Sequence, residues 1–560
     1  MSTLEQTLTS MEKSNALLEN TLRNQNVSSL ALFQKEGTYQ PASFKTSETL
    51  LNALEDDVKK TFPSIAQKQA NQLLECIPSQ DQVTGKKIAV LFSGGPASGG
   101  HNVVAGIKAV LGAANTLYGV KAGPKGLIEG DLFELNDDMV AEVLNLGGFD
   151  LLGSDRTKIK TPEQFEAVKN TVKTFNLDGI IVVGGDDSNT NAAFLAENLA
   201  ETGCSVIGVP KTIDGDLQIG ALLPISFGFD TATKIYSEMV GNILQDTPSS
   251  RKYWHFVKLM GRSASHVALE VALQTRPQLC FISEEVAAKK MSLNEIISEC
   301  VDVIVSRSKQ GKDYGVVLIP EGLIEFIPEL KGLMSQLNDS IAQQDDSFNS
   351  LDFDEKKAKI SPTLSSSLSQ LFNSLPNAIQ QQLLLERDSH GNVQVSQIPT
   401  ELLLIEMIQN KLKEVAPEVK FSSNRHFFGY EGRCGAPSLF DSSYTFNLGL
   451  IAGSLAARAK SGYIAALSDL SDGGKAYAIP IPNLVVQEKR HGTTEMVIKK
   501  ALVEMDSKAF KYFQSRRKDW AGSDKFTSPG PRQFWGPVAN QVPFTVALNQ
   551  GYSSLNFDFK

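Results

Sequence analysis

The sequence predicts an α/β fold in which parallel sheets are covered by helices on both faces. Short runs of β-branched and apolar residues alternate with helical segments from about residue 86 onward. Strands connected by helices run parallel, because each helix carries the chain back across the sheet. The chain has 560 residues, which exceeds a single ordinary core and predicts two to four domains.

Each element of the first α/β block has a local signal. Thr161-Pro162-Glu163-Gln164 is a capping box with proline at the first helical position, so a helix begins there and ends near Phe175. A glycine-rich loop at 94–100 separates the first strand from the first helix. The expected strands are Lys86–Phe92, Ile180–Val183 and Cys204–Val209, and the expected helices cover 101–115 and Thr161–Phe175.

A second block of alternating segments begins near residue 250, and its clearest strand is YGVVLIPEG, Tyr314–Gly322. Residues from about 325 to 405 are rich in Ser, Gln and Leu and predict a helical insertion. Residues 1–85 contain no dense glycine turns and predict a helical N-terminal extension. The expected parts are therefore 1–85, a first α/β domain at 86–245 completed by part of 435–560, a second at 246–434 with the insertion, and a C-terminal segment at 435–560.

Composition and charge exclude several classes of function. The formal net charge of −9 argues against nucleic acid as a principal ligand, because phosphate neutralisation requires a concentrated basic face. No uninterrupted apolar run reaches about 18 residues, and the N-terminus lacks a signal-peptide pattern, so no membrane association is expected. Five cysteines without a CxxC pair are typical of reduced thiols, which predicts a cytoplasmic protein.

Three loops follow successive strands at the same end of the predicted sheet. Ligands collect beyond the carboxyl ends of strands in open α/β sheets, so these loops are the candidate site. None of them has the GK[ST] of a Walker loop or the GxGxxG spacing of a dinucleotide fold. The three loops are GGPASGG at 94–100, GGDDS at 184–188 and PKTIDGD at 210–216.

The third loop carries two carboxylates and a lysine. Asp214 and Asp216 are two residues apart, so in an extended segment both project to one side while Ile213 points into the protein. Such a pair suits a general base beside a metal-organising group. Lys211 supplies a mobile positive charge suited to a leaving phosphate. The alternative for this loop alone is a surface ion pair between Lys211 and Asp216.

Five motifs occur in a fixed order over about residues 86–450: GGDDSN, PKTIDGD, KLMGRSASH, PEG and GYEGR. With these motifs the sequence resembles the phosphofructokinases, and in particular their long pyrophosphate-dependent branch. The resemblance implies two similar Rossmann-like parallel-sheet domains with the active site between them. It implies reversible, Mg²⁺-assisted transfer of a phosphoryl group from pyrophosphate to the 1-hydroxyl of fructose 6-phosphate.

The resemblance also gives a reason for the second aspartate of GGDDS. ATP-using relatives commonly carry glycine at the position of Asp187, where it makes room for the α-phosphate, and glycine at the position of Lys211. A carboxylate about 4 Å from a phosphate charge is repelled by about 4 kcal/mol at an effective dielectric near 20, roughly a thousandfold in affinity. We therefore expect Asp187 to exclude ATP and Lys211 to stabilise the departing phosphate.

The remaining roles follow from the same resemblance. Asp214 is expected to be the base, with Thr212 and Ile213 beside the acceptor, Gly95 at the donor and Asp186 at the magnesium ion. Asp216 would hold a metal-bound water, and Arg156 would contact phosphate. Arg262 would stabilise charge between donor and acceptor. Glu321 is expected to accept hydrogen bonds from the sugar hydroxyls, and Tyr430 and Arg433 are expected to clamp the 6-phosphate. The residues expected at the sugar phosphate are Met260, Gly261, Arg262, Glu321, Tyr430, Glu431, Gly432 and Arg433.

Two further expectations concern neighbours of these motifs. Lys252 and Tyr253 occupy positions at which relatives reach into the sugar site of an adjacent subunit, which implies a homodimer. His255 and His266 flank the MGR motif, and we interpret both as packing residues because an aspartate base leaves them no necessary role. The first loop has Ser98-Gly99 where many relatives carry a proline and one glycine.

Other functions are weighed against the same residues. An ATP-dependent phosphofructokinase would share the base, and Asp187 and Lys211 argue against it. A non-catalytic regulatory subunit or a ligand-binding module could lose the base, whereas this sequence retains Asp214, Asp186 and Arg262.

Overall fold

The computed structural model describes residues 4–6, 27–49, 51–69, 72–344, 346–385, 397–490, 493–530 and 539–560. The chain forms two compact units. Unit 1 comprises Met1–Ile235, Tyr430–Ala501 and Arg532–Lys560, and unit 2 comprises Tyr236–Gly429 and Leu502–Pro531. The domain boundaries expected after 245 and 434 thus fall at Ile235, inside helix α10 (Phe229–Ser250), and at Gly429, inside the GYEGR motif.

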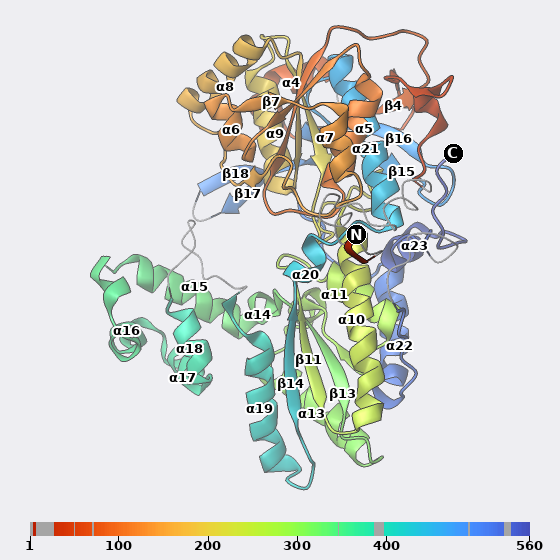
Figure 1. The fold of residues 1–560 in the computed structure, drawn as a ribbon. Helices are drawn as coiled ribbons and strands as arrows, with labels where there is room; N and C mark the ends of the chain where they lie inside the picture. The colour runs from red at the N-terminus through yellow and green to blue at the C-terminus, as the bar shows by residue number, and fades with distance from the viewer. Residues whose placement is uncertain are drawn as a thin grey trace. The chain divides into compact units, whose positions relative to one another are not determined.

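Unit 1 is built on a ten-stranded mixed sheet (Figure 1). Five strands at its centre run parallel in the order β15-β10-β9-β5-β6, and antiparallel strands flank them. Its strands are β3 (Ser43–Thr46), β4 (Leu74–Ile77), β5 (Lys87–Ser93), β6 (Thr116–Val120), β7 (Leu132–Glu134), β8 (Ser154–Asp155), β9 (Gly179–Gly184), β10 (Ser205–Pro210), β15 (Tyr463–Ser468) and β16 (Lys475–Pro480).

Helices cover both faces of this sheet, as the alternating sequence predicted. Strand β9 is buried throughout because α9 packs on one of its faces and α21 on the other. The capping box at Thr161 begins α8, which ends at Phe175 as expected. The helices of unit 1 are α3 (Asp56–Thr61), α4 (Pro63–Gln69), α5 (Gly100–Leu111), α6 (Gly123–Glu129), α7 (Asp137–Val143), α8 (Pro162–Phe175), α9 (Asp186–Asn198), α20 (Tyr430–Arg433), α21 (Leu439–Ala457) and α23 (Phe544–Gln550).

Unit 2 has a four-stranded parallel sheet in the order β12-β13-β11-β14. Its strands are β11 (Trp254–Leu259), β12 (Leu279–Cys280), β13 (Gly315–Pro320) and β14 (Ser423–Phe428). Most of α10 belongs to this unit. Its other helices are α11 (His266–Thr275), α12 (Ser283–Ala288), α13 (Leu293–Ser308), α14 (Leu323–Phe326), α15 (Pro328–Ala342), α16 (Phe353–Ile360), α17 (Ser366–Ser374), α18 (Asn377–Leu383), α19 (Thr400–Val415) and α22 (Lys508–Gly522).

The expected helical insertion corresponds to helices α14 to α18, which follow β13. Helices α15 to α19 bury a stripe of leucine and isoleucine side chains that is continuous with the core of unit 2. Lys258 on β11 ties this region to the sheet: its ammonium donates to the carbonyl of Ile398 at 3.0 Å and lies 3.6 Å from the carboxylate of Glu401.

The N-terminal segment differs from the helical extension that the sequence predicted. Helices α3 and α4 are present, but β3 and β4 add two antiparallel strands to the large sheet of unit 1. A two-stranded hairpin, β1 (Gln34–Lys35) and β2 (Thr38–Tyr39), precedes them. Strands this short carry little local signal, and pairing with β16 decides their conformation. Residues 1–3 and 7–26 of the predicted extension lie outside the described residues.

The contact between α5 and α21 requires glycine. A Cβ atom on Gly106 would lie 2.1 Å from the carbonyl oxygen of Phe446, and one on Gly449 would lie 2.2 Å from that of Val103. The backbones of α5 and α21 are therefore in direct contact where the two helices cross. Helix α21 also packs on β9 and β10, two of the strands that carry the candidate loops.

We expect Gly106→Ala to destabilise unit 1, by about 1–3 kcal/mol or more, because the added methyl group must push the two backbones apart. Gly332→Ala is the matched control, since Gly332 lies in α15 with no atom within 4 Å of an added Cβ. Alanine in an exposed helix is favoured over glycine by about 0.5–1 kcal/mol, so this control should be neutral or stabilising. Thermal unfolding compares the two, and an unchanged midpoint for Gly106→Ala would contradict the crossing.

Candidate active site

The loop after β5 is held open by a left-handed glycine. Gly94 has φ +85° and donates its N–H to the carbonyl of Asp155 at 2.8 Å. Ser154 donates its hydroxyl to the carbonyl of Gly94 at 2.6 Å, so the loop is fixed from β8. A Cβ atom on Gly94 would lie 3.4 Å from Nζ of Lys211. The ammonium of Lys211 thus lies directly beside this loop.

The loop after β9 leads at once into helix α9, whose N-cap is Gly185. Asp186 and Asp187 lie in the first turn of this helix, where the helix dipole stabilises negative charge. Asn189 is buried and donates to the carbonyls of Gly184 and Gly185, which fixes the turn. Asp187 is half exposed and pairs with Lys158 at 3.2 Å.

The loop after β10 is a turn, whereas the sequence predicted an extended segment. Gly215 has φ +72°, and the hydroxyl of Thr212 accepts the N–H of Asp214 at 3.1 Å, so the chain bends between the two aspartates. Ile213 is buried as predicted. Lys211 donates its N–H to the carbonyl of Gly184 at 2.9 Å, which joins this loop to the preceding one.

Lys211 is the buried cation of the site, with a relative exposure of 7%. Burial lowers the pKa of its ammonium to about 8, in spite of the opposing charges of Asp214 and Asp186, and Arg156 lowers it further. The alternative of a surface ion pair with Asp216 is therefore wrong, because Lys211 is not at the surface. Its charge depends on the anions around it.

A second lysine reaches the same carboxylates, and sequence reasoning missed it. Nζ of Lys500 lies 3.7 Å from a carboxylate oxygen of Asp186 and 3.7 Å from one of Asp216. Burial disfavours its charge, but Asp186, Asp216 and two further aspartates outweigh that effect and raise the pKa of Lys500. A lone lysine far along the chain, outside every motif, offers no sequence signal.

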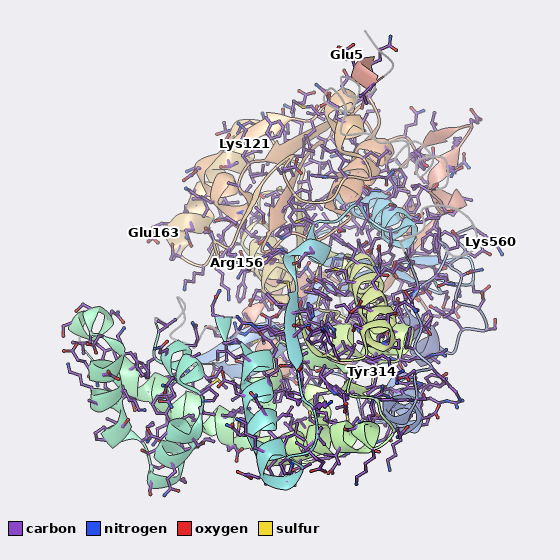
Figure 2. All side chains as sticks on the ribbon, turned by 60° about the horizontal axis from the view of Figure 1, so that its bottom comes forward. Glu5, Lys121, Arg156, Glu163, Tyr314 and Lys560 are labelled. Carbon is purple, nitrogen blue, oxygen red and sulfur yellow. The ribbon has the colours of Figure 1, made fainter. Side chains whose placement is uncertain are left out.

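Two arginines flank the first loop. A Cβ atom on Gly95 would lie 3.4 Å from Nη1 of Arg433 and 3.7 Å from Nη2 of Arg156. Arg156 follows β8 in unit 1 and is labelled in Figure 2. The guanidinium of Arg433 also stacks on the exposed ring of Tyr430, 4.7 Å from its centroid. Arg433, expected at the sugar phosphate, thus lies beside a residue expected at the donor, and its role stays a prediction.

In unit 2 the polar residues expected at the sugar phosphate lie at the carboxyl ends of β11 and β13. The N–H of Gly261 donates to a carboxylate oxygen of Glu321 at 2.9 Å, and Glu321 is 4% exposed. Met260 donates its N–H to Phe428 at the end of β14. Arg262 is half exposed and lies 3.7 Å from Glu325. These contacts bring Gly261, Arg262 and Glu321 to one edge of the sheet.

Lys252 and Tyr253 precede β11, and the ammonium of Lys252 lies 4.9 Å from the centroid of the Tyr253 ring. The role expected for both residues at a neighbouring subunit stays a prediction. The other two residues of the GYEGR motif expected at the sugar phosphate, Glu431 and Gly432, lie within the single turn of α20.

A divalent cation fits the carboxylates of unit 1. Asp186 and Asp216 share the ammonium of Lys500, so their oxygens face a common position. Mg²⁺ is bound by one or two carboxylates together with phosphate oxygens and water, rather than by an all-protein cage. Among the residues that the structure describes, no group of three or more His, Cys, Asp or Glu could hold a metal ion. The two carboxylates of Asp186 and Asp216 therefore suit a cation that arrives with a phosphate ligand.

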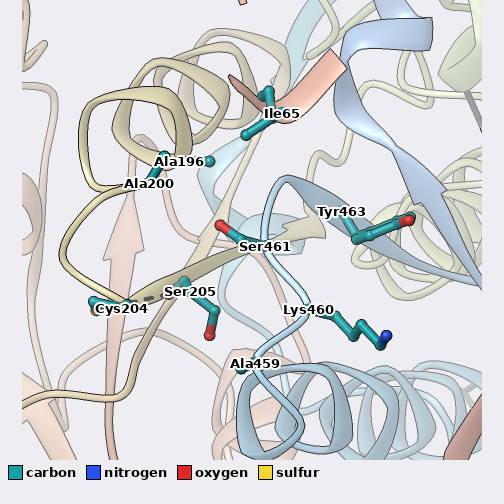
Figure 3. A pocket seen from close by; sticks show the side chains of 10 residues that line it. Ile65, Ala196, Ala200, Cys204, Ser205, Ala459, Lys460, Ser461 and Tyr463 are labelled. Carbon is teal, nitrogen blue, oxygen red and sulfur yellow. Dashed lines mark hydrogen bonds between the residues drawn. The ribbon is translucent and has the colours of Figure 1, made fainter. Parts of the chain in front are cut away.

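A cavity of about 350 Å³ opens at the other end of the same sheet (Figure 3). Ser205 and Tyr463, the first residues of β10 and β15, line it together with Cys204. Ligands of open α/β sheets bind at the carboxyl ends of the strands, whereas this cavity lies at the amino ends. We therefore do not assign the substrate to it.

An α/β protein with this arrangement binds a phosphate-bearing anion, because glycine loops, a buried lysine, further cations and carboxylates gather at the carboxyl ends of its parallel strands. The chain belongs to the phosphofructokinase family, whose model matches residues 87–455. Phosphotransferases of this kind generally require a divalent metal ion.

Relatives and solved structures agree with this assignment. The chain is 47% identical over 513 residues to the pyrophosphate--fructose 6-phosphate 1-phosphotransferase of Treponema pallidum, covering 89% of each chain. It is 44% identical over 542 residues to the Entamoeba histolytica protein of the same name, covering 93% of this chain and 99% of the other. A pyrophosphate-dependent phosphofructokinase from Marinobacter aquaeolei has the same fold, with a TM-score of 0.51 and 14% identity. The match covers 85% of this chain and 100% of the other. The Rossmann-like α/β fold expected from the sequence is thereby confirmed.

The histidines beside MGR pack in unit 2. Nδ1 of His255 lies 2.9 Å from Nε2 of His426 on the adjacent strand, and the two rings stack. Burial, followed by the neighbouring His426, lowers the pKa of His255 to about 4, and Asp246 opposes this only in part. His266 is buried at the start of α11.

This pair predicts acid-sensitive folding. An unfolded histidine takes up its proton near pH 6.5, whereas folded His255 does so near pH 4, so the unfolded state binds more protons between these values. Stability is therefore lost as the pH falls through this window. In His255→Phe the thermal midpoint should fall less than in the wild type between about pH 7 and about pH 5. An equal fall of the thermal midpoint in both proteins would show that His255 is not the source of the acid sensitivity.

Proposed function

We propose that this protein transfers a phosphoryl group from pyrophosphate to the 1-hydroxyl of fructose 6-phosphate, giving fructose 1,6-bisphosphate and phosphate, and that it also catalyses the reverse reaction. The observation that carries this proposal is the pair Asp187 and Lys211 at the donor loops. Lys211 is buried beside Gly94, and Asp187 occupies the first turn of α9. The names of the two relatives above point to the same reaction.

Unit 1 supplies the donor end of the reaction. Lys211 and Arg156 place positive charge beside the backbone of the Gly94-Gly95 loop, where a phosphate group of the donor would bind. As the bridging oxygen leaves with inorganic phosphate, negative charge grows on that phosphate. The ammonium of Lys211 neutralises this charge and so lowers the barrier to bond breaking.

Asp214 acts as the general base. Its carboxylate takes the proton of the sugar 1-hydroxyl as the hydroxyl oxygen forms its bond to phosphorus and the bond to the bridging oxygen breaks. The turn at Thr212 and Gly215 fixes the direction of Asp214, which suits a base that must meet one hydroxyl. In the reverse direction Asp214 returns the proton.

We assign the cation to Mg²⁺, held by Asp186, with Asp216 beside it through a bound water. Bound there, Mg²⁺ would neutralise charge on the pyrophosphate oxygens. In unit 2, Glu321 accepts hydrogen bonds from the sugar hydroxyls, and Arg262 stabilises charge between donor and acceptor. The retained base and lysine argue against a non-catalytic regulatory subunit.

Two further parts of the proposal concern the whole protein. The protein acts as a homodimer in which Lys252 and Tyr253 enter the sugar site of the neighbouring subunit. It is located in the cytoplasm, in keeping with five cysteines that form no disulfide. In the part of the chain that the structure describes, no helix is long and apolar enough to cross a membrane.

Donor choice is tested by Asp187→Gly and Lys211→Ala, with fructose 6-phosphate and Mg²⁺ fixed and pyrophosphate or ATP supplied in turn. The wild type should use pyrophosphate alone. Asp187→Gly should gain ATP turnover, because repulsion worth roughly a thousandfold in affinity is removed. Lys211→Ala should lose pyrophosphate turnover by about a hundredfold or more, since a charged contact to the leaving group is lost.

Asp137→Gly serves as the control for the first variant, because Asp137 is likewise an aspartate in the first turn of a helix, α7, outside the three loops. ATP turnover in the wild type would discard the proposed role of Asp187. Full pyrophosphate turnover in Lys211→Ala would discard that of Lys211.

The shared site is tested by mixing two inactive variants, Asp214→Asn and the double variant Lys252→Ala with Tyr253→Ala. If each site combines residues of two subunits, a mixed dimer has one intact site and one doubly defective site. Random exchange of equal amounts should then restore about a quarter of wild-type activity. Sedimentation shows whether dimers form. Mixed dimers without recovered activity would contradict the proposal.

A further inference from the structure

Lys500 is brought to the donor carboxylates by a β-hairpin that no motif includes. Strands β17 (Val485–Arg490) and β18 (Thr493–Ile498) pair antiparallel in unit 1, and β18 lies against helix α9. The chain leaves β18 two residues before Lys500. The hairpin therefore serves as a support that carries one lysine to the N-terminal end of α9.

The backbone on either side of Lys500 is fixed to the elements that carry its partners. Ile498 donates its N–H to the hydroxyl of Thr190 on α9 at 3.0 Å. Ala501 donates its N–H to the carbonyl of Asp216 at 2.7 Å. Because Lys500 lies between these two anchors, its backbone is held close to Asp186 and Asp216, whose carboxylates its ammonium approaches.

Lys500 and Lys211 lie near the same carboxylates but differ in burial. Asp186, Asp214 and Asp216 influence the charge of both lysines. Lys211 is buried, whereas the side chain of Lys500 is 33% exposed. The outer lysine is therefore accessible to an incoming anion while the inner one is enclosed by the loops.

We propose that Lys500 is a second lysine of the pyrophosphate site, which neutralises Asp186 and Asp216 in the empty enzyme and binds an oxygen of pyrophosphate when the donor arrives. This rests on the proposed function of unit 1. Two carboxylates that share an ammonium attract a free divalent cation less than two bare ones. Lys500 thereby weakens binding of the cation alone and favours the cation that comes with pyrophosphate.

The test compares Lys500→Met with Lys499→Met. Lys499 is the adjacent lysine and is exposed, so its substitution by methionine removes the same charge from the same segment. Lys500→Met should raise the KM and the Kd for magnesium pyrophosphate by about 10-fold to 100-fold, since a charge-assisted contact is lost. The KM for fructose 6-phosphate should stay unchanged, Lys500→Arg should recover most of the loss, and Lys499→Met should match the wild type.

A second readout does not use turnover. Mn²⁺ alone, titrated by electron paramagnetic resonance, should bind Lys500→Met more tightly than it binds the wild type or Lys499→Met. The proposal predicts opposite changes in one variant: the free cation should bind more tightly, and pyrophosphate should bind more weakly. A lysine that merely supports the fold would weaken both.

Unchanged pyrophosphate affinity in Lys500→Met, or weaker Mn²⁺ binding, would overturn the role of Lys500. Failure of the wild type to bind and turn over pyrophosphate would instead overturn the proposed function of the whole site. The two outcomes are separated because the first compares variants and the second concerns the wild type alone.

Discussion

The site in unit 1 depends on the neutralisation of carboxylates that the fold brings together. Two like charges about 4 Å apart repel by about 4 kcal/mol at an effective dielectric near 20, so a cluster of aspartates is stable only with cations among them. The structure supplies these cations from several elements. The carboxylates are Asp186, Asp187, Asp214 and Asp216, and the cations around them are Lys158, Lys211, Lys500 and Arg156.

The parallel sheet explains why these charges can be placed so closely. Strands β5, β9 and β10 are hydrogen-bonded neighbours, so the loops that follow them emerge side by side. Each loop is then fixed by the next: Lys211 donates its N–H to the loop after β9, and Ser188 donates its hydroxyl to that of Ser93 at the end of β5. Rigid loops let the site hold its charges in place before a ligand binds, which lowers the reorganisation that binding requires.

Much of this arrangement could be predicted from the sequence, because its signals are local. The capping box at Thr161 and the apolar run at Ile180 predicted the bounds of helix α8 and strand β9 to within about one residue. The five motifs placed the aspartates and Lys211 at the ends of the right strands. The confirmed fold follows from the alternation of such segments.

The parts that could not be predicted depend on contacts between distant segments. Lys500 lies 284 residues after Asp216 in the chain and reaches it because a hairpin carries it there, and nothing local distinguishes Lys500 from other lysines. Strands β3 and β4 form because β16 offers them an edge, not because of their own composition. The bend at Asp214 depends on Gly215 and on one side-chain hydrogen bond, which an alternation rule does not register.

A donor without a nucleoside places a particular demand on such a site. ATP offers an apolar base whose burial contributes binding energy, whereas pyrophosphate offers only charged oxygens. All of its affinity must come from cations and N–H groups, and these must be dense. Dense cations would repel one another without carboxylates between them, so a site specialised for pyrophosphate requires both charges in near balance. Asp187 contributes to this balance through its ion pair with Lys158. On the proposed function it meets the requirement a second time, because its carboxylate would repel the α-phosphate of ATP.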